Sequence, residues 1–358
     1  MGKKRLLTEK KRLETPDNMR GFAILFMILI HVMNLYGNNE ATHGWQHQVI
    51  DFLAGPPAAP VFMCTMGFFF ILKKPGFFFG IKRGVLLLLI GYGLNIVKGF
   101  LPVFIARHCL QFDSELIPIY YTNYYLIFNV EILIFAGIAY IIMNLLSRVS
   151  VRPEFFLVSA GIVTLISPFL WGLGSETAFL QHIVTPLWGA DPDLVIFPVF
   201  PWIVYPLLGM AAGGIYRNQS NPKRLSMLSG LFGGMLTVLG GSLLLIDFDR
   251  FFHDYGQQSW GALLAFSGFI FLWGLVIRFL GSLIPSRFKP GFLAYLSRNI
   301  TQIYIIQWIL LGWLFFCIPF HSLSLIGVCI VNVFITALSC LITEGYNRIT
   351  SYKRISTS

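Results

Sequence analysis

The chain has 358 residues, of which 56% are hydrophobic and only 12% are charged, and its mean hydropathy is +0.72. Soluble domains contain about 25% charged residues. This composition indicates a lipid environment and excludes a soluble enzyme, a disordered protein and a secreted disulfide scaffold. The five cysteines show no spacing typical of a metal site.

Ten apolar runs are long enough to cross a bilayer, because a spanning helix needs about 20 mainly apolar residues. The predicted spans are 20–37, 52–72, 79–99, 123–146, 155–173, 194–216, 226–246, 259–282, 300–318 and 323–345. We therefore expect an all-α, polytopic integral membrane protein. Its transmembrane domain is predicted to cover residues 20–346, between a basic segment at 1–19 and a short tail at 347–358.

The net charge of +10 is explained by topology. If the N-terminus lies inside and the chain crosses ten times, only Lys98, Arg107 and Arg250 of the 26 Lys and Arg residues fall on the outer side. This follows the positive-inside rule. We therefore expect both termini in the cytoplasm, a multi-pass protein of the cell (inner or plasma) membrane, and contact with anionic lipid. No nucleic-acid partner is needed.

Two ionisable residues share a face of the first predicted helix. Arg20 and His31 are eleven residues apart, which is almost three helical turns and roughly 16 Å. Ionisable groups at membrane depth are costly and often functional. A basic group at the membrane surface and a proton acceptor deeper in the membrane would suit a phosphate-bearing donor. The alternatives are an ordinary flanking charge for Arg20 and a packing histidine for His31.

Two further pairs are candidates for binding or chemistry. Lys82 and Arg83 follow a basic hinge and could hold a pyrophosphate, or they could be positive-inside anchors. His43 and His47 lie between the first two predicted spans, near Asp51, and are expected to share a helix face. They could position an acceptor. No third metal ligand is evident, so no metal is expected.

Polar residues also interrupt two later spans. Glu131 is the only acid within the fourth apolar run and needs a partner, for which Arg83 and His31 are the candidates. Catalysis and a structural ion pair explain Glu131 equally well. Tyr304 and Gln307 are three residues apart and could form hydrogen bonds toward the interior together.

Glycines occur four residues apart in two predicted helices, at Gly209 and Gly213 and at Gly230 and Gly234. Small residues at this spacing let membrane helices approach closely. We therefore expect both pairs to lie at helix–helix contacts.

Several short motifs resemble known membrane acyltransferases. Arg20-Gly21 followed by His31 resembles the first-helix signature of transmembrane acyltransferases, including acyltransferase family 3. Residues 60–67, 130–139 and 197–209 resemble the heparan-α-glucosaminide N-acetyltransferase catalytic family and its bacterial relatives, and 298–308 resembles a late helix of these families. The chain departs from their patterns at Gln307, where His is common, and at Glu131, where Asp is frequent. The Trp-Ser-Leu signature expected before this acid is also missing.

The resemblance implies transfer of an acyl group, with acetyl as the leading choice, from cytoplasmic acyl-CoA to a hydroxyl or amine of a carbohydrate acceptor. It makes His31 the catalytic histidine, with Arg20 and Arg83 at the coenzyme phosphates. In the heparan-type branch the catalytic histidine instead lies in the loop after the first helix, where this chain has His43 and His47. The expected partners are the lipid bilayer, acyl-CoA and a glycan, and a homodimer is left open. The alternative function is a transporter or exporter of a small anionic molecule.

Overall fold

The computed structural model describes residues 13–110, 123–174, 184–189, 194–219, 221–283 and 291–356. The first twelve residues of the predicted basic segment and the last two of the tail lie outside this set. In chain order the helices are α1 (Glu14–Tyr36), α2 (Asn39–His43), α3 (Trp45–Ala54), α4 (Ala59–Lys73), α5 (Phe77–Asn95), the π-helix η1 (Ile96–Phe100), α6 (Leu101–His108), α7 (Asn123–Phe128), α8 (Ile132–Val149), α9 (Pro153–Leu170), α11 (Val199–Trp202), α12 (Val204–Asn218), α13 (Pro222–Ile246), α14 (Phe248–Phe252), α15 (Trp260–Leu283), α16 (Gly291–Arg298), α17 (Ile300–Leu314) and α18 (Leu325–Ser356).

The described part of the chain confirms the all-α membrane architecture. Nine of its helical segments are long and apolar enough to cross a membrane, with α3–α4, α5–α6 and α11–α12 each counted as one segment. The remaining predicted span corresponds to α17, which has 15 residues and is shorter than the other nine. The ten predicted spans therefore correspond to nine long helical segments and one short apolar helix.

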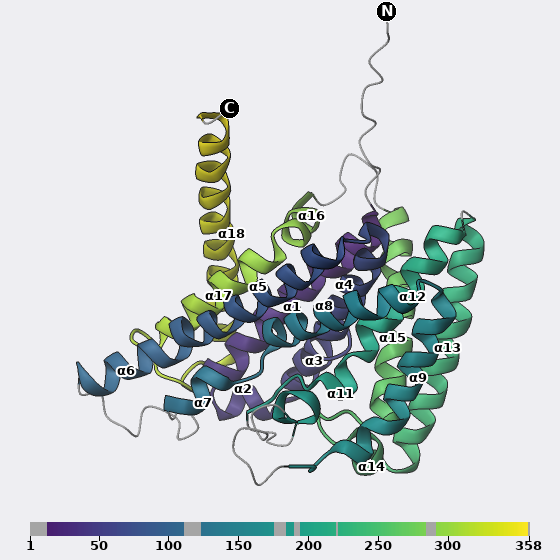
Figure 1. Cartoon of the computed structure of the whole chain (residues 1–358). Helices are drawn as coiled ribbons and strands as arrows, with labels where there is room; N and C mark the ends of the chain where they lie inside the picture. Colours follow the sequence, from purple (N-terminus) through teal and green to yellow (C-terminus); the bar gives the residue numbers. More distant parts are fainter. Residues whose placement is uncertain are drawn as a thin grey trace, which may run out of the picture.

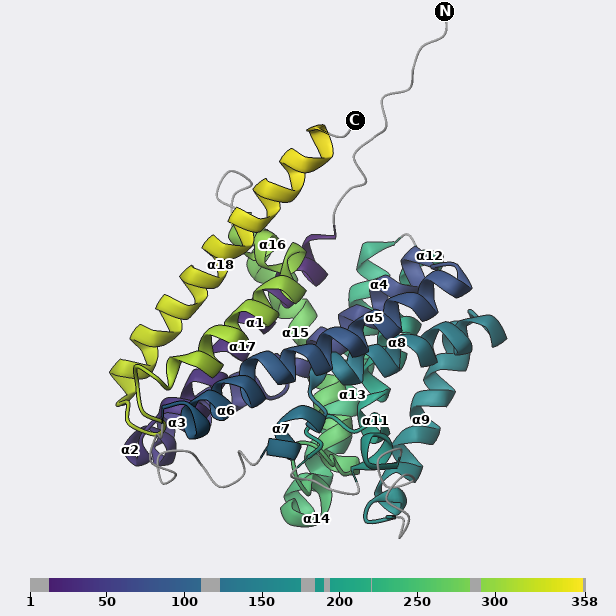
Figure 2. The same cartoon turned by 60° about the vertical axis from the view of Figure 1, so that its left-hand side comes forward.

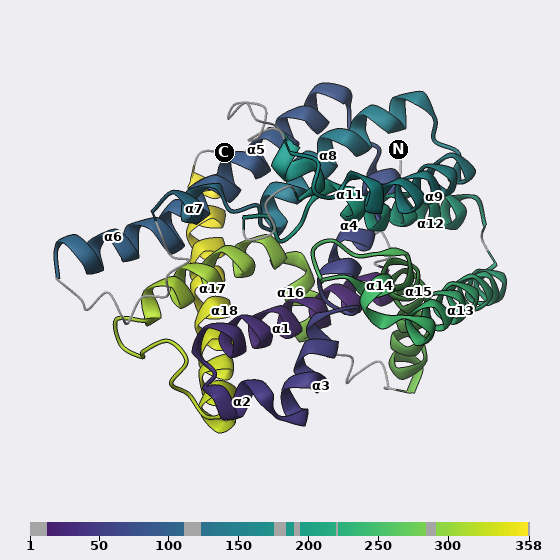
Figure 3. The ribbon, with the colours of Figure 1, turned by 90° about the horizontal axis from the view of Figure 1, so that it is seen from below.

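The helices form one bundle around α1, which contacts α3, α4, α15, α16, α17 and α18. The N-terminal end of α1 and the C-terminal end of α18 lie on the same side, at the top of Figure 1. In Figure 2, α18 runs along one edge of the bundle beside α17. Seen from below in Figure 3, α13 lies on another edge, packed on α15. That the side of the termini faces the cytoplasm stays a prediction.

The predicted span 123–146 is not one helix, because residues 129–131 are extended between α7 and α8. Glu131 has φ −93° and ψ 178°. The side-chain amide of Asn95 donates to the backbone oxygens of Ile127 (3.0 Å) and Asn129 (2.7 Å). The backbone N–H of Val130 donates to Leu194 O at 2.8 Å. These bonds satisfy backbone groups that an open break in a membrane helix would otherwise leave unpaired.

The predicted span 79–99 is part of a longer helical segment, Phe77–His108, with the π-helix η1 inside it. Lys98, which the predicted topology places at the outer end of this span, lies within η1 and is followed by α6 in the same helical segment. A π-turn inside an α-helix is rare and often occurs at functional sites. Lys98 is thus a cation inside the bundle.

Candidate functional site

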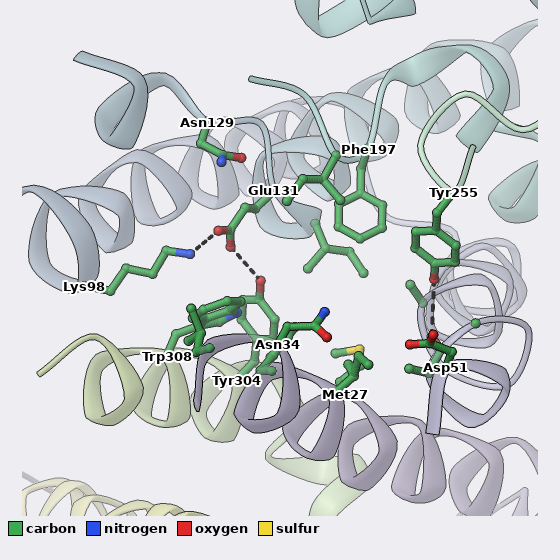
Figure 4. A pocket seen from close by; sticks show the side chains of 18 of the residues that line it. Met27, Asn34, Asp51, Lys98, Asn129, Glu131, Phe197, Tyr255, Tyr304 and Trp308 are labelled. Carbon is green, nitrogen blue, oxygen red and sulfur yellow. Dashed lines mark hydrogen bonds and ion pairs between the residues drawn. The ribbon is translucent and has the colours of Figure 1, made fainter. Parts of the chain in front are cut away.

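A cavity of about 1200 Å³ lies between the C-terminal half of α1, α3, η1, the break before α8, the loop before α15, and α17 (Figure 4). Its lining includes His31, Lys98, Asn129, Glu131 and Tyr304. Polar groups from separate helices therefore meet in one largely apolar cavity. This is the usual composition of a small-molecule site.

His31 lines the cavity and is held on two sides by α17. Its Nδ1 lies 3.4 Å from Oε1 and 3.2 Å from Nε2 of the Gln307 amide. Its ring lies 4.1 Å from the ring of Trp308, centroid to centroid. Gln307 and Tyr304 both face the interior, as their three-residue spacing predicts. They have different partners, however: Gln307 contacts His31, and Tyr304 contacts Glu131.

Glu131 is paired with Lys98, and not with Arg83 or His31, the partners that the sequence suggested. The Lys98 ammonium donates to Glu131 Oε1, and the Tyr304 hydroxyl donates to Oε2 at 3.1 Å. Figure 4 shows both contacts at one end of the cavity. The side chains of Lys98 and Glu131 are only 9% and 11% exposed. Lys98 was not among the predicted site residues because it was counted with the outer flanks of the spans, although a lysine within an apolar run is itself a signal.

Two more groups at this end complete the polar cluster. Lys98 Nζ lies 3.6 Å from the centre of the Trp308 ring, a cation–π contact. Asn129 Oδ1 is buried and has no hydrogen-bond partner among the described residues. A buried polar atom without a partner costs about 1–3 kcal/mol. A ligand N–H or O–H bound beside Asn129 would supply the missing bond.

Asp51 and Tyr255 lie at the other end of the cavity (Figure 4). The Tyr255 hydroxyl donates to Ala54 O at 3.3 Å. Burial raises the pKa of Tyr255, so this hydroxyl stays protonated and can donate. Phe197 and Phe266 also line the cavity and have their rings 6.3 and 6.5 Å from that of Tyr255. This end therefore offers aromatic faces together with a carboxylate.

The three basic residues predicted to hold phosphates do not line the cavity. Arg20 lies 5.5 Å from the centre of the Phe69 ring. Lys82 and Arg83 are exposed on α5, and Arg83 lies 5.6 Å from the centre of the Tyr140 ring.

The loop histidines lie on two helices, so the expectation that they share a helix face is wrong. Gly44 separates α2, which ends at His43, from α3, which contains His47. His43 is exposed, and its Nδ1 donates to Asn39 O at 2.9 Å. His47 Nδ1 lies 3.0 Å from Asp51 Oδ2. Only His47 is therefore connected to the cavity, through Asp51.

In the described part of the chain, no group of three or more His, Cys, Asp or Glu side chains could hold a metal ion. Among the described residues that line the cavity, Lys98 supplies a positive charge.

Comparison with known proteins gives one family. The family model described as "Heparan-alpha-glucosaminide N-acetyltransferase, catalytic" matches residues 12–248. No curated protein matches the sequence. The matched segment runs from α1 through α13 and contains His31, Lys98 and Glu131, whereas Tyr304 and Gln307 follow it. The cavity is thus completed by a helix outside the matched segment.

Proposed function

Because the chain belongs to the heparan-α-glucosaminide N-acetyltransferase catalytic family, we propose that an acetyl group passes in this cavity from acetyl-CoA to a hydroxyl or amine of a sugar-type acceptor. The chain is a multi-pass membrane protein of an acetyltransferase family. The family match does not favour the alternative of a transporter for a small anion.

His31 in the cavity wall is the observation that carries the proposal. When His31 Nδ1–H donates to Gln307 Oε1, the other ring nitrogen, Nε2, has a free lone pair. A neutral imidazole in this tautomer can act as a general base. The surrounding helices keep the cavity largely apolar, so little water would compete with the acceptor for the acetyl group.

The proposed reaction is a direct transfer. The acceptor heteroatom gives its proton to His31 Nε2 as it attacks the acetyl carbonyl carbon. The C–S bond of the thioester then breaks, its electron pair stays on sulfur, and the imidazolium returns the proton to the thiolate. Asn129, with its unpaired buried oxygen, would accept a hydrogen bond from the acceptor. In the alternative route His31 itself is acetylated and then passes the acetyl group on.

For the donor, we propose that Arg20, Lys82 and Arg83 hold the phosphates of the coenzyme. Arg20 lies on α1, the helix that carries His31. Arginine binds phosphate through two parallel hydrogen bonds, and the exposed position of Lys82 and Arg83 leaves them accessible to a soluble coenzyme.

The loop histidines are the second candidate for the base, and one contact favours them: His47 touches Asp51, which lines the cavity. In that reading Asp51 would orient His47 at the mouth of the cavity. His31 is the stronger candidate because it lines the cavity itself.

The test is transfer of labelled acetyl from acetyl-CoA to amino-sugar and neutral-sugar acceptors by the purified protein in nanodiscs. General acid–base catalysis contributes about 10²–10⁴-fold, so we expect His31→Ala to lose activity by about that factor. His108→Ala, an exposed histidine on α6, is the matched control. Label retained on the wild-type protein without acceptor would indicate the acetyl-histidine route.

Full activity of His31→Ala would contradict the assignment of the base. Flux of an anion through proteoliposomes that contain no acetyl-CoA, without any acetyl transfer by the wild type, would favour the transporter.

A further inference from the structure

The buried Lys98–Glu131 pair requires an explanation beyond stability. Moving two charges out of water costs several kcal/mol per ion, and such a pair often stabilises a fold no better than apolar residues would. Yet the chain places both charges, about one-tenth exposed, in the wall of a cavity, with Lys98 inside a helical segment that is long and apolar enough to cross a membrane. Charges retained in such a position usually have a function.

Glu131 is not available as a base, because both of its oxygens are engaged. Oε1 accepts from Lys98 and Oε2 accepts from Tyr304. The break before α8 is held by Asn95, which donates to Asn129 O, and by the Val130 N–H, which donates to Leu194 O. The extended backbone of Glu131 follows directly, so these bonds help to fix where the carboxylate lies. Glu131 is thus placed to orient Lys98.

Lys98, in contrast, has donor capacity left. An ammonium has three N–H donors. Glu131 takes one of them, and the Trp308 ring lies against the ammonium at 3.6 Å. Lys98 also lines the cavity, so a further N–H can reach a bound molecule.

Lys98 and His31 share one neighbour. The Trp308 indole contacts the Lys98 ammonium and lies 4.1 Å from the His31 ring, centroid to centroid. A cation and an imidazole therefore contact the same indole ring, and all three groups line the same cavity. An acetyl transfer needs this combination: a base for the attacking group and a donor for the oxygen that becomes negative.

We infer that Lys98 is a catalytic residue that donates a hydrogen bond to the acetyl carbonyl oxygen, and that Glu131 and Tyr304 are its positioning residues. As the acceptor attacks the carbonyl carbon, the C=O π electrons move to oxygen, and Lys98 stabilises this negative charge. When the C–S bond breaks, the electrons return to re-form C=O and sulfur leaves as the thiolate. Lys98 keeps its proton throughout. The inference rests on the proposed function.

The test separates chemistry from the structural role of the ion pair. Lys98→Met, Glu131→Gln and the double variant are compared in nanodiscs for single-turnover acetyl transfer, acetyl-CoA affinity and thermal unfolding. The double variant removes both charges, so it avoids a buried unpaired carboxylate and keeps the experiment meaningful if Lys98→Met folds poorly. Lys223→Met, an exposed lysine at the start of α13, is the control.

Loss of one oxyanion donor costs about 10²–10³-fold in rate. We expect that loss in Lys98→Met and equally in the double variant, with the acetyl-CoA Kd nearly unchanged and a smaller loss in Glu131→Gln. Recovery of the rate in the double variant would overturn the inference, because the pair would then be only structural. A parallel loss of acetyl-CoA affinity would also overturn it, by making Lys98 a group that binds the donor. If the wild type transfers acetyl and Lys98→Met is as fast, this inference fails but the proposed function stands. If the folded wild type transfers no acetyl, the proposed function fails as well.

Discussion

The α13–α15 pair and the helices around the cavity pack in lipid by different means. Between α13 and α15, contact depends on missing side chains: a Cβ at Gly268 would collide with the backbone of Thr237, and one at Gly240 with the backbone of Ala265. Around the cavity, α1, η1 and α17 are joined by polar contacts of Lys98, Glu131 and His31. Small residues thus mark where helices pack closely, and ionisable residues mark the candidate site.

The largest expected effect on stability comes from breaking the close packing. Gly268→Leu must displace the backbone of α13, and overpacking costs about 1–3 kcal/mol or more. We expect a lowered unfolding temperature in detergent and loss of folded protein. Gly234→Leu is the matched control on α13, because a Cβ there meets nothing within 4 Å. Equal stability of the two variants would contradict the role of Gly268.

The next prediction concerns a substitution at the candidate site that leaves the packing of α13 on α15 unchanged. Gln307→Leu keeps the size of the side chain but removes the amide beside His31 Nδ1. Loss of a buried hydrogen-bond partner costs about 1–3 kcal/mol, so we expect acetyl transfer to slow by about tenfold, with stability changed less than by Gly268→Leu. The pH profile of kcat should also shift, which a purely structural role would not require. Gln48→Leu, at an exposed position on α3, is the control.

The sequence predicted where helices lie better than what their polar residues contact. The length of an apolar run reflects the thickness of the hydrocarbon layer, and the distribution of Lys and Arg reflects topology. Both can be read directly from the sequence, and the predicted spans were largely confirmed. The Glu131–Lys98 pair joins residues 33 apart through a π-turn and an extended break, and no periodicity encodes either of them.

Of the glycine pairs, Gly209 and Gly213 do face α4, whereas Gly230 and Gly234 have room for a Cβ and the contact between α13 and α15 uses Gly233. Spacing alone cannot tell which face of a helix meets a neighbour.

A smaller effect is expected at the basic residues outside the cavity. Arg20→Ala and Arg83→Ala remove groups proposed to hold phosphates, and partly exposed ion pairs contribute about 0.2–1 kcal/mol each. The KM for acetyl-CoA should rise a few-fold in each variant while kcat stays the same, and added salt should weaken binding by the wild type. Arg224→Ala, an exposed arginine on α13, is the control. A fall in kcat without a change in KM would contradict a role in donor binding.

The smallest expected effect is at the loop histidines, and it decides between the two candidate bases. The His43→Ala/His47→Ala double variant removes an exposed side chain and one partner of Asp51 but leaves His31, Gln307 and the Lys98 cluster in place. Acetyl transfer should therefore stay within about twofold of the wild type. Folding stability should also change little, because surface substitutions change it by only about 0.5 kcal/mol. If the double variant loses transfer while His31→Ala remains active, the base lies at the mouth of the cavity beside Asp51. The polar end around His31 and Lys98 would then have to bind substrate without abstracting its proton.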